Sequence, residues 1–175
     1  MKRLALGLVL VCGWSCGPKQ AGTDAPDMSS AASLEVSSSA FKNGETIPEK
    51  FGGYGQATPV ELHWGKVPTG TKSIAVMVED PDAPGLSPFV HWLVTNLPAT
   101  ATSTAEKGDV QPNSAGEAGF YPPKPPAGSV HQYHFEVFAL DVPQVKAHDR
   151  DGFLNEIKGH VLAKGELVGL YAKPG

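Results

Sequence analysis

Four polar residues in this chain have types and positions that could bind an anion. Asp80 follows a long apolar run, His91 stands near the start of the next, and His131 and Tyr133 open a third. His131 and Tyr133 are two residues apart, so on a strand they share one face. If the four side chains converge, imidazole N–H and phenol O–H groups could hold a phosphate or a carboxylate. Asp80 would orient one histidine, and a nearby carboxylate raises the pKa of a histidine and favours its charged form.

The residues give less support to a catalytic or metal site. No Gly-x-Ser-x-Gly motif is present, and both cysteines, Cys12 and Cys16, lie near the N-terminus, far from the four residues. Two histidines and one aspartate could form a metal triad, but the histidines lack the close spacing of a strong site. Each residue alone could also be structural, such as Asp80 in a turn beside prolines. We therefore predict a non-enzymatic binding protein without a cofactor, with a hydrolase or a metal enzyme as the weaker alternative.

The elements that must position these residues are predicted to be strands of a mainly β domain. Residues 73–78 are largely apolar on both alternating faces, as expected of a central strand that is covered on both sides. The order of strands, with one late helix, favours antiparallel pairing over an alternating α/β fold. On the strand that follows, His91 should share its face with Leu93 and Thr95. The further strands predicted by the pattern are 34–36, 60–64, 90–97 and 133–140.

One helix is predicted near the C-terminus. Apolar residues at 153, 154, 157, 161 and 162 recur at helical spacing, and Asp149 or Asp151 can cap the helix. Residues 167–171 then indicate a last strand or a turn. The run Pro122–Pro126 cannot join the interior of a sheet. We predict that it forms a stiff loop, which leads to His131 and supplies a wall of the pocket.

The N-terminus has the features of an export signal. Lys2 and Arg3 precede the apolar run 4–11, which is too short to span a membrane. Small residues then lead to Cys16, which resembles the lipidated cysteine of a lipoprotein; ordinary secretion and a retained N-terminal anchor are the alternatives. We predict three segments, with the last exported and anchored at the cell envelope: a signal peptide 1–15, a flexible tether 16–33 and one domain 34–175.

The charge pattern argues against nucleic acid as a partner. The chain has a formal net charge of −4 and no cluster of basic residues. Proteins that bind nucleic acid or anionic membrane surfaces usually present such clusters. The lipid anchor is therefore the contact with a membrane that we expect.

Several ordered motifs resemble the phosphatidylethanolamine-binding protein family, which includes the Raf kinase inhibitor proteins. The most specific motif is Asp-Pro-Asp-Ala-Pro at Asp80–Pro84. His91-Trp92 and His131-Gln132-Tyr133 follow in the order that the family shows, and Gly159–Ala163 resembles its C-terminal helix. The resemblance extends over about residues 34–171 and is closest to the bacterial branch of the family.

The resemblance implies a large antiparallel sheet packed with a smaller sheet, together with a C-terminal helix. It also implies a shallow pocket for phosphate-like groups, including phosphorylethanolamine head groups. By analogy with animal relatives, the alternative function is an inhibitor or interaction module that docks a protein partner. The pocket residues that the resemblance implies are Asp80, Pro84, His91, Pro126, His131 and Tyr133.

Overall fold

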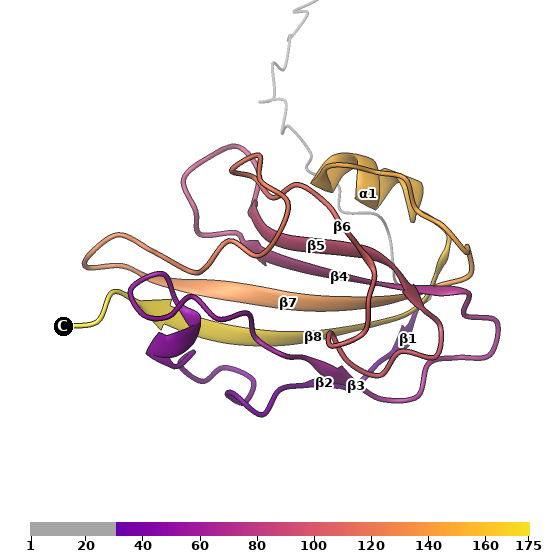
Figure 1. Ribbon diagram of the computed structural model, residues 1–175, viewed down its shortest axis with the longest axis horizontal. Coiled ribbons are helices and arrows are strands. Elements are labelled where there is room, and N and C mark those ends of the chain that lie inside the picture. Colours follow the sequence, from indigo (N-terminus) through magenta and orange to yellow (C-terminus); the bar gives the residue numbers. More distant parts are fainter. Residues whose placement is uncertain (1–30) are drawn as a thin grey trace, which may run out of the picture.

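The long apolar runs of the sequence form the central strands of one sheet (Figure 1). The structure is a computed structural model that describes residues 31–175. Its helical elements are the 3₁₀-helix η1 (Glu49–Phe51) and the α-helix α1 (Arg150–Glu156). Its strands are β1 (Ala32–Ser33), β2 (Val36–Ser37), β3 (His63–Trp64), β4 (Ser73–Asp80), β5 (Phe89–Pro98), β6 (Asp109–Val110), β7 (Val130–Leu140) and β8 (Val161–Ala172).

The strands form a six-stranded sheet in the order β1-β8-β7-β4-β5-β6 and a two-stranded sheet of β2 and β3. This arrangement confirms the predicted mainly β class, with a larger sheet packed with a smaller one. All pairs in the larger sheet are antiparallel except β1 with β8, so the sheet is mixed. The parallel pair begins at Ala32, two residues before the predicted start of the domain. The predicted signal peptide 1–15, Cys16 and tether residues 17–30 lie outside the described residues.

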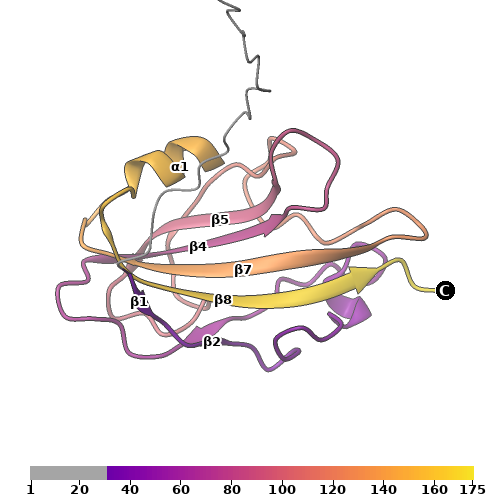
Figure 2. The same cartoon turned by 180° about the vertical axis from the view of Figure 1, so that it is seen from behind.

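Two apolar cores lie on opposite faces of the large sheet, and β4 is buried between them. The small-sheet core includes Leu62, Trp64, Ile74, Val76 and Phe135. The helix-side core packs α1 against the other face and includes Ala75, Met77, Leu93, Phe138 and Phe153. Residues 73–78 are therefore buried on both faces, which confirms the prediction from their uninterrupted apolar character. The two layers that cover the sheet can be seen in Figures 1 and 2.

The single α-helix of the described residues lies near the C-terminus, as predicted, but it is shorter than its apolar spacing indicates. Asp149 caps it, with its side chain accepting a hydrogen bond from the Gly152 N–H at 2.8 Å. Gly159 has a φ of 79°, a left-handed conformation that turns the chain away after the helix. Val161–Ala163 then pair with the end of β7, so the assignment of Gly159–Ala163 to the helix is wrong. Within residues 31–175, no helix has both the length and the apolar character that would cross a membrane.

Strand bounds differ from the prediction most where pairing is short. Of the predicted strand 34–36, only Val36 lies in a strand, β2, while β1 precedes it, and the predicted strand 60–64 is reduced to β3. The two-residue strand β6 has no signal in the sequence, since two residues cannot show a period. The predicted 167–171 segment belongs to the much longer strand β8, which pairs with β7 over its whole length.

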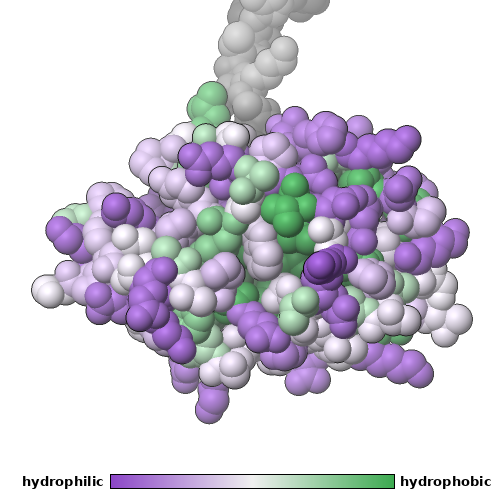
Figure 3. Space-filling view, in the orientation of Figure 1, coloured by the Kyte–Doolittle hydropathy of each residue, from purple (hydrophilic) through white to green (hydrophobic). Residues whose placement is uncertain are grey.

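One end of the large sheet gathers the residues that the sequence singled out. β4 ends there, while β5 and β7 begin there, because both are antiparallel neighbours of β4. The loops 81–88 and 121–129 lie at the same end in both views (Figures 1 and 2). Figure 3 shows that hydrophilic residues cover much of one broad face, with hydrophobic residues exposed near its middle.

A register shift in β5 determines where His91 points. Two consecutive residues of β4 lie opposite Trp92 and Val90, which leaves His91 as an extra residue between them. An extra residue of this kind forms a β-bulge and changes the direction of the side chains around it. Leu93 packs in the helix-side core, whereas His91 lines a cavity on the other side of the sheet. The prediction that these two residues share a face is therefore wrong.

Candidate ligand-binding pocket

A cavity of about 170 Å³ lies at this end of the sheet. It is bounded by the ends of β4, β5 and β7 and by the two loops beside them. The structure brings all six predicted pocket residues to it: Asp80, Pro84, His91, Pro126, His131 and Tyr133. The lining residues that the prediction left out are Ala83, Phe89, Tyr121, Lys124 and Pro125.

The Asp80 carboxylate is held on both of its oxygens. Its Oδ2 lies 2.7 Å from His131 Nδ1, and its Oδ1 accepts a hydrogen bond from the Asp82 N–H at 2.8 Å. Asp82 in turn accepts a hydrogen bond from the backbone N–H of Gln132 at 2.8 Å, which ties the acidic turn to the start of β7. Asp80 is 3% exposed and His131 is 7% exposed, so this pair is shielded from water. The aspartate therefore orients His131, as the sequence predicts.

His91 is fixed by a reciprocal contact with the loop after β6. Its Nδ1 lies 2.7 Å from the Tyr121 carbonyl oxygen, and the Tyr121 N–H donates to the His91 carbonyl oxygen at 2.7 Å. A carbonyl oxygen only accepts, so Nδ1 carries the hydrogen. Burial lowers the pKa of His91, and this outweighs the opposite effects of the Tyr121 hydrogen bond and the Asp80 charge. The Asp80 charge therefore acts on the pKa of His91 in the direction that the sequence predicts, but burial has the larger effect and favours the neutral ring.

Tyr133 places its phenol beside both histidines. Its ring centroid lies 5.1 Å from that of His91 in an edge-on arrangement and 6.4 Å from that of His131. Burial raises the pKa of Tyr133, and the neighbouring Asp80 carboxylate raises it further. The phenol therefore stays protonated and can donate a hydrogen bond at any physiological pH.

The proline-rich loop is pinned against the region of η1. The Tyr54 hydroxyl donates to the Pro125 carbonyl oxygen at 2.7 Å, and the Gly53 N–H donates to that of Pro123 at 2.7 Å. Because proline also restricts the backbone, this part of the wall is preformed. Lys124 projects from the same loop, and its Nζ lies 5.6 Å from the centroid of the Tyr54 ring.

Contacts between segments that are distant in sequence bring the remaining lining residues to the cavity, and the sequence did not predict them. Phe89 packs its ring 4.8 Å from His91 and 5.3 Å from Tyr121, measured between centroids. Tyr121 comes directly before the proline run, and that position was its available signal. Lys124 lies within the run itself, but a lone lysine in a loop usually indicates only a solvated surface.

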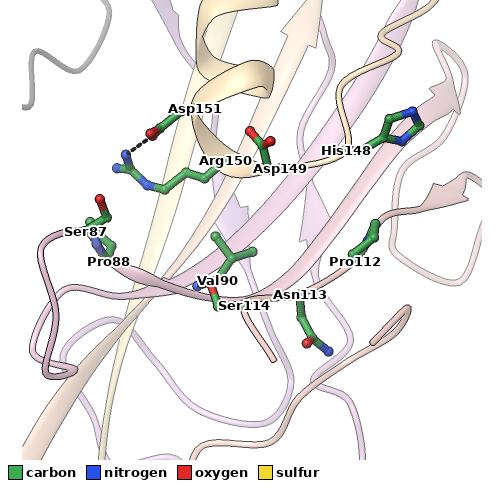
Figure 4. Close-up of a pocket in the computed structure, with 10 residues that line it drawn as sticks. All are labelled: Ser87, Pro88, Val90, Pro112, Asn113, Ser114, His148, Asp149, Arg150 and Asp151. Atoms are coloured by element: carbon green, nitrogen blue, oxygen red, sulfur yellow. Dashed lines mark hydrogen bonds and ion pairs between the residues drawn. The ribbon is translucent and has the colours of Figure 1, made fainter. Parts of the chain in front are cut away.

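A larger cleft of about 440 Å³ lies beside the start of α1 (Figure 4). Arg150 and Asp151 lie at one end of it and His148 at the other. Two of its polar groups already have partners, since Arg150 donates to Glu79 at 2.7 Å and His148 Nδ1 lies 3.2 Å from Gln111. These contacts join the start of α1 to β4 and to the residue after β6. Among residues 31–175, no group of three His, Cys, Asp or Glu side chains is placed to hold a metal ion.

Comparisons with known proteins agree with this architecture. The model of the family described as phosphatidylethanolamine-binding protein matches residues 37–172. A UPF0098 protein of Chlamydia muridarum is 36% identical over 150 residues, covering 79% of this chain and 98% of that protein. A UPF0098 protein of Aquifex aeolicus is 34% identical over 155 residues, covering 81% and 90%.

Two crystal structures resemble the fold closely. The phosphatidylethanolamine-binding protein homologue CT736 of Chlamydia trachomatis superposes with a TM-score of 0.74 at 33% identity, covering 82% of this chain and 100% of that one. YbcL of E. coli, described as a new member of the mammalian family, gives a TM-score of 0.71 at 34% identity over the same shares. The chain therefore belongs to the phosphatidylethanolamine-binding protein family, and its fold is that of a binding protein of this family.

Proposed function

We propose that this protein binds a small phosphate-like or phosphorylated anion in the cavity formed by Asp80, His91, His131 and Tyr133, and that it catalyses no reaction. The observation that carries the proposal is the convergence of two imidazoles and a phenol on one small cavity. Their partner Asp80 already has both carboxylate oxygens engaged, so it positions a histidine and does not act as a free base.

The free polar atoms of the site support this function. Within residues 31–175, the only buried side-chain nitrogen or oxygen without a hydrogen-bond partner is the Tyr171 hydroxyl. The Nε2 atoms of His91 and His131 have no partner among these residues, so they must reach open space. Both rings line the cavity, so we infer that the two Nε2 atoms face it. With the phenol, they form a polar cluster inside apolar walls, as small-ligand sites commonly do.

A titration with phosphorylethanolamine, followed by histidine-resolved NMR, tests the proposal. We expect selective shifts at His91 and His131. The His131→Ala variant should weaken binding by about tenfold or more, because a charge-assisted hydrogen bond contributes roughly 1.5–3 kcal/mol. The matched control is His134→Ala, on the same strand but ion-paired with Glu166 on the opposite face. Equal affinity of a folded His131→Ala protein and the wild type would remove His131 from the site.

We also propose that the protein is exported and anchored at the cell envelope through Cys16. The support is the sequence alone: a basic pair, the apolar run 4–11 and small residues before the cysteine. Metabolic labelling with a radioactive fatty acid in a bacterial host should mark the wild type and leave Cys16→Ala unlabelled. Cys12→Ala is the control, and equal labelling of wild type and Cys16→Ala would contradict the anchor.

A further inference from the structure

The geometry of His91 points to a requirement that depends on the proposed anion site. We infer that the cavity binds its anion together with one proton, held between an anion oxygen and His91 Nε2, and that it therefore prefers phosphate monoesters to diesters. The preference follows from where hydrogens can and cannot lie in the pocket.

The contact with Tyr121 determines the tautomer of His91. Its Nδ1 must donate to the Tyr121 carbonyl oxygen, 2.7 Å away, because that oxygen has no hydrogen to give. The Tyr121 N–H also donates to the backbone carbonyl oxygen of His91, which keeps the Tyr121 carbonyl in place beside the ring, so turning the ring over would break the Nδ1 hydrogen bond. A neutral His91 therefore presents a lone pair at Nε2, the atom that faces the cavity.

Burial has the largest effect on the charge of the His91 ring. His91 is 4% exposed, and burial lowers its pKa, so the neutral form predominates near neutral pH. Asp80 favours the charged ring, whereas His131 opposes it. The titratable or charged groups that line the cavity with His91 are Asp80 from β4, His131 and Tyr133 from β7, and Tyr121 and Lys124 from the loop 121–129.

A bound anion needs a hydrogen between one of its oxygens and His91 Nε2. An anion oxygen placed against the lone pair of His91 Nε2 is repelled unless a hydrogen lies between the two atoms. The neighbouring groups do not supply that hydrogen. His131 donates from Nδ1 to Asp80, so its own Nε2 can donate to an anion oxygen only when that ring carries a second hydrogen, and the Tyr133 phenol can donate to a different anion oxygen. One proton must therefore come either from the ligand or from water onto the ring.

Phosphate esters differ in their ability to bring this proton. A monoester has a second pKa of about 6, so its monoanion carries a P–OH group that can donate to Nε2. A diester carries one negative charge and no hydroxyl, so it can bind only after the buried ring itself takes up a proton. The head group of an intact phospholipid is a diester. The cavity is therefore matched to free phosphorylated head groups and other monoesters.

Calorimetric titration of the full chain with methyl phosphate and dimethyl phosphate tests this inference. Titrations in two buffers with different heats of ionisation count the protons taken up. At pH 8 we expect uptake of at least one proton with either ligand, and affinity that falls at least about tenfold per pH unit above that pH. At pH 7 methyl phosphate should bind at least about fivefold more tightly than dimethyl phosphate, since only it brings a hydroxyl.

A His91→Gln variant provides the matched test, because the amide of glutamine can donate a hydrogen bond at any pH. In this variant we expect the proton uptake by dimethyl phosphate to fall by about one, while His134→Gln should behave as the wild type. Binding of both ligands with equal affinity and no proton uptake would overturn this inference and leave the anion site intact. Failure of both ligands to bind between pH 5 and pH 8 would overturn the anion site as well.

Discussion

Lys124 adds a positive charge at the rim of the cavity. Its side chain is exposed, so we expect it to attract anions at a distance and to contribute little as a direct contact. Lys124→Ala should weaken methyl phosphate binding about two- to fivefold at low salt, and the difference should shrink near 0.5 M salt because exposed charges are screened. Calorimetry at both salt concentrations measures the effect.

Lys158→Ala is the control for this change, since Lys158 is also exposed but does not line the cavity. An effect of Lys124→Ala that stays equally large at high salt would contradict attraction at a distance. It would show a close contact between the ammonium group and the bound anion.

At the level of single residues, the sequence predicts which side chains meet better than it predicts their charge. Asp80, His91 and His131 could be chosen because polar residues of these types stand at the ends of apolar runs. The direction of the pKa of His91 could not be predicted, because it depends on how deeply packing buries the ring. The contact of Tyr121 with His91 could not be predicted either, since it joins segments that are distant in sequence.

Strand β8 crosses close to the N-terminal segment at a glycine. A Cβ added at Gly165 would overlap the Leu34 carbonyl oxygen and crowd Val36. Leu34 lies between β1 and β2, and Val36 begins β2, so the backbone of this segment would have to move. We expect Gly165→Ala to lower the free energy of unfolding by about 1–3 kcal/mol, as overpacking usually does. Urea denaturation measures the change.

Gly65→Ala is the matched control, because a Cβ there meets only the Cβ of Glu35 at an ordinary 3.7 Å. We expect its stability to stay within about 0.5 kcal/mol of the wild type. Equal stability of Gly165→Ala and the wild type would mean that the contact of β8 with Leu34 is looser than the structure shows.

At the level of elements, length decides how well the sequence predicts the structure. The central strands β4, β5 and β7 extend the predicted runs by only a few residues. The helix was predicted too long because Val161 and Leu162 continue its spacing by chance, although β7 offers them a strand partner. The bulge in β5 could not be predicted, since an extra residue leaves no mark on local residue types.

The stability of the whole molecule should depend on pH through His91. Because its pKa is lowered in the folded state, the unfolded chain binds more protons between that lowered value and about 6.5. Stability therefore rises with pH through this window, and the contribution of His91 is lost as pH falls through it. Without ligand, we expect the wild type to lose more stability than His91→Gln between pH 7 and pH 5.

Thermal unfolding of both proteins at several pH values measures the difference between the two slopes. The comparison is needed because other groups also titrate. Burial raises the pKa of Glu136, which pairs with Lys164, so its contribution falls as pH rises through the interval above about 4.3. Since both proteins contain Glu136, this contribution cancels. Parallel slopes would contradict a neutral, buried His91.

His91 adds one residue to β5 without changing the alternation of the side chains before and after it. If β5 lacked this residue, Val90 and Trp92 would become neighbours opposite Glu79 and Val78, and the register shift at this point would disappear. The remaining side chains of the strand would keep their present faces. The molecule thus carries one of its candidate ligand groups as a single-residue insertion that the sheet does not require, so a deletion there would remove recognition while sparing the architecture.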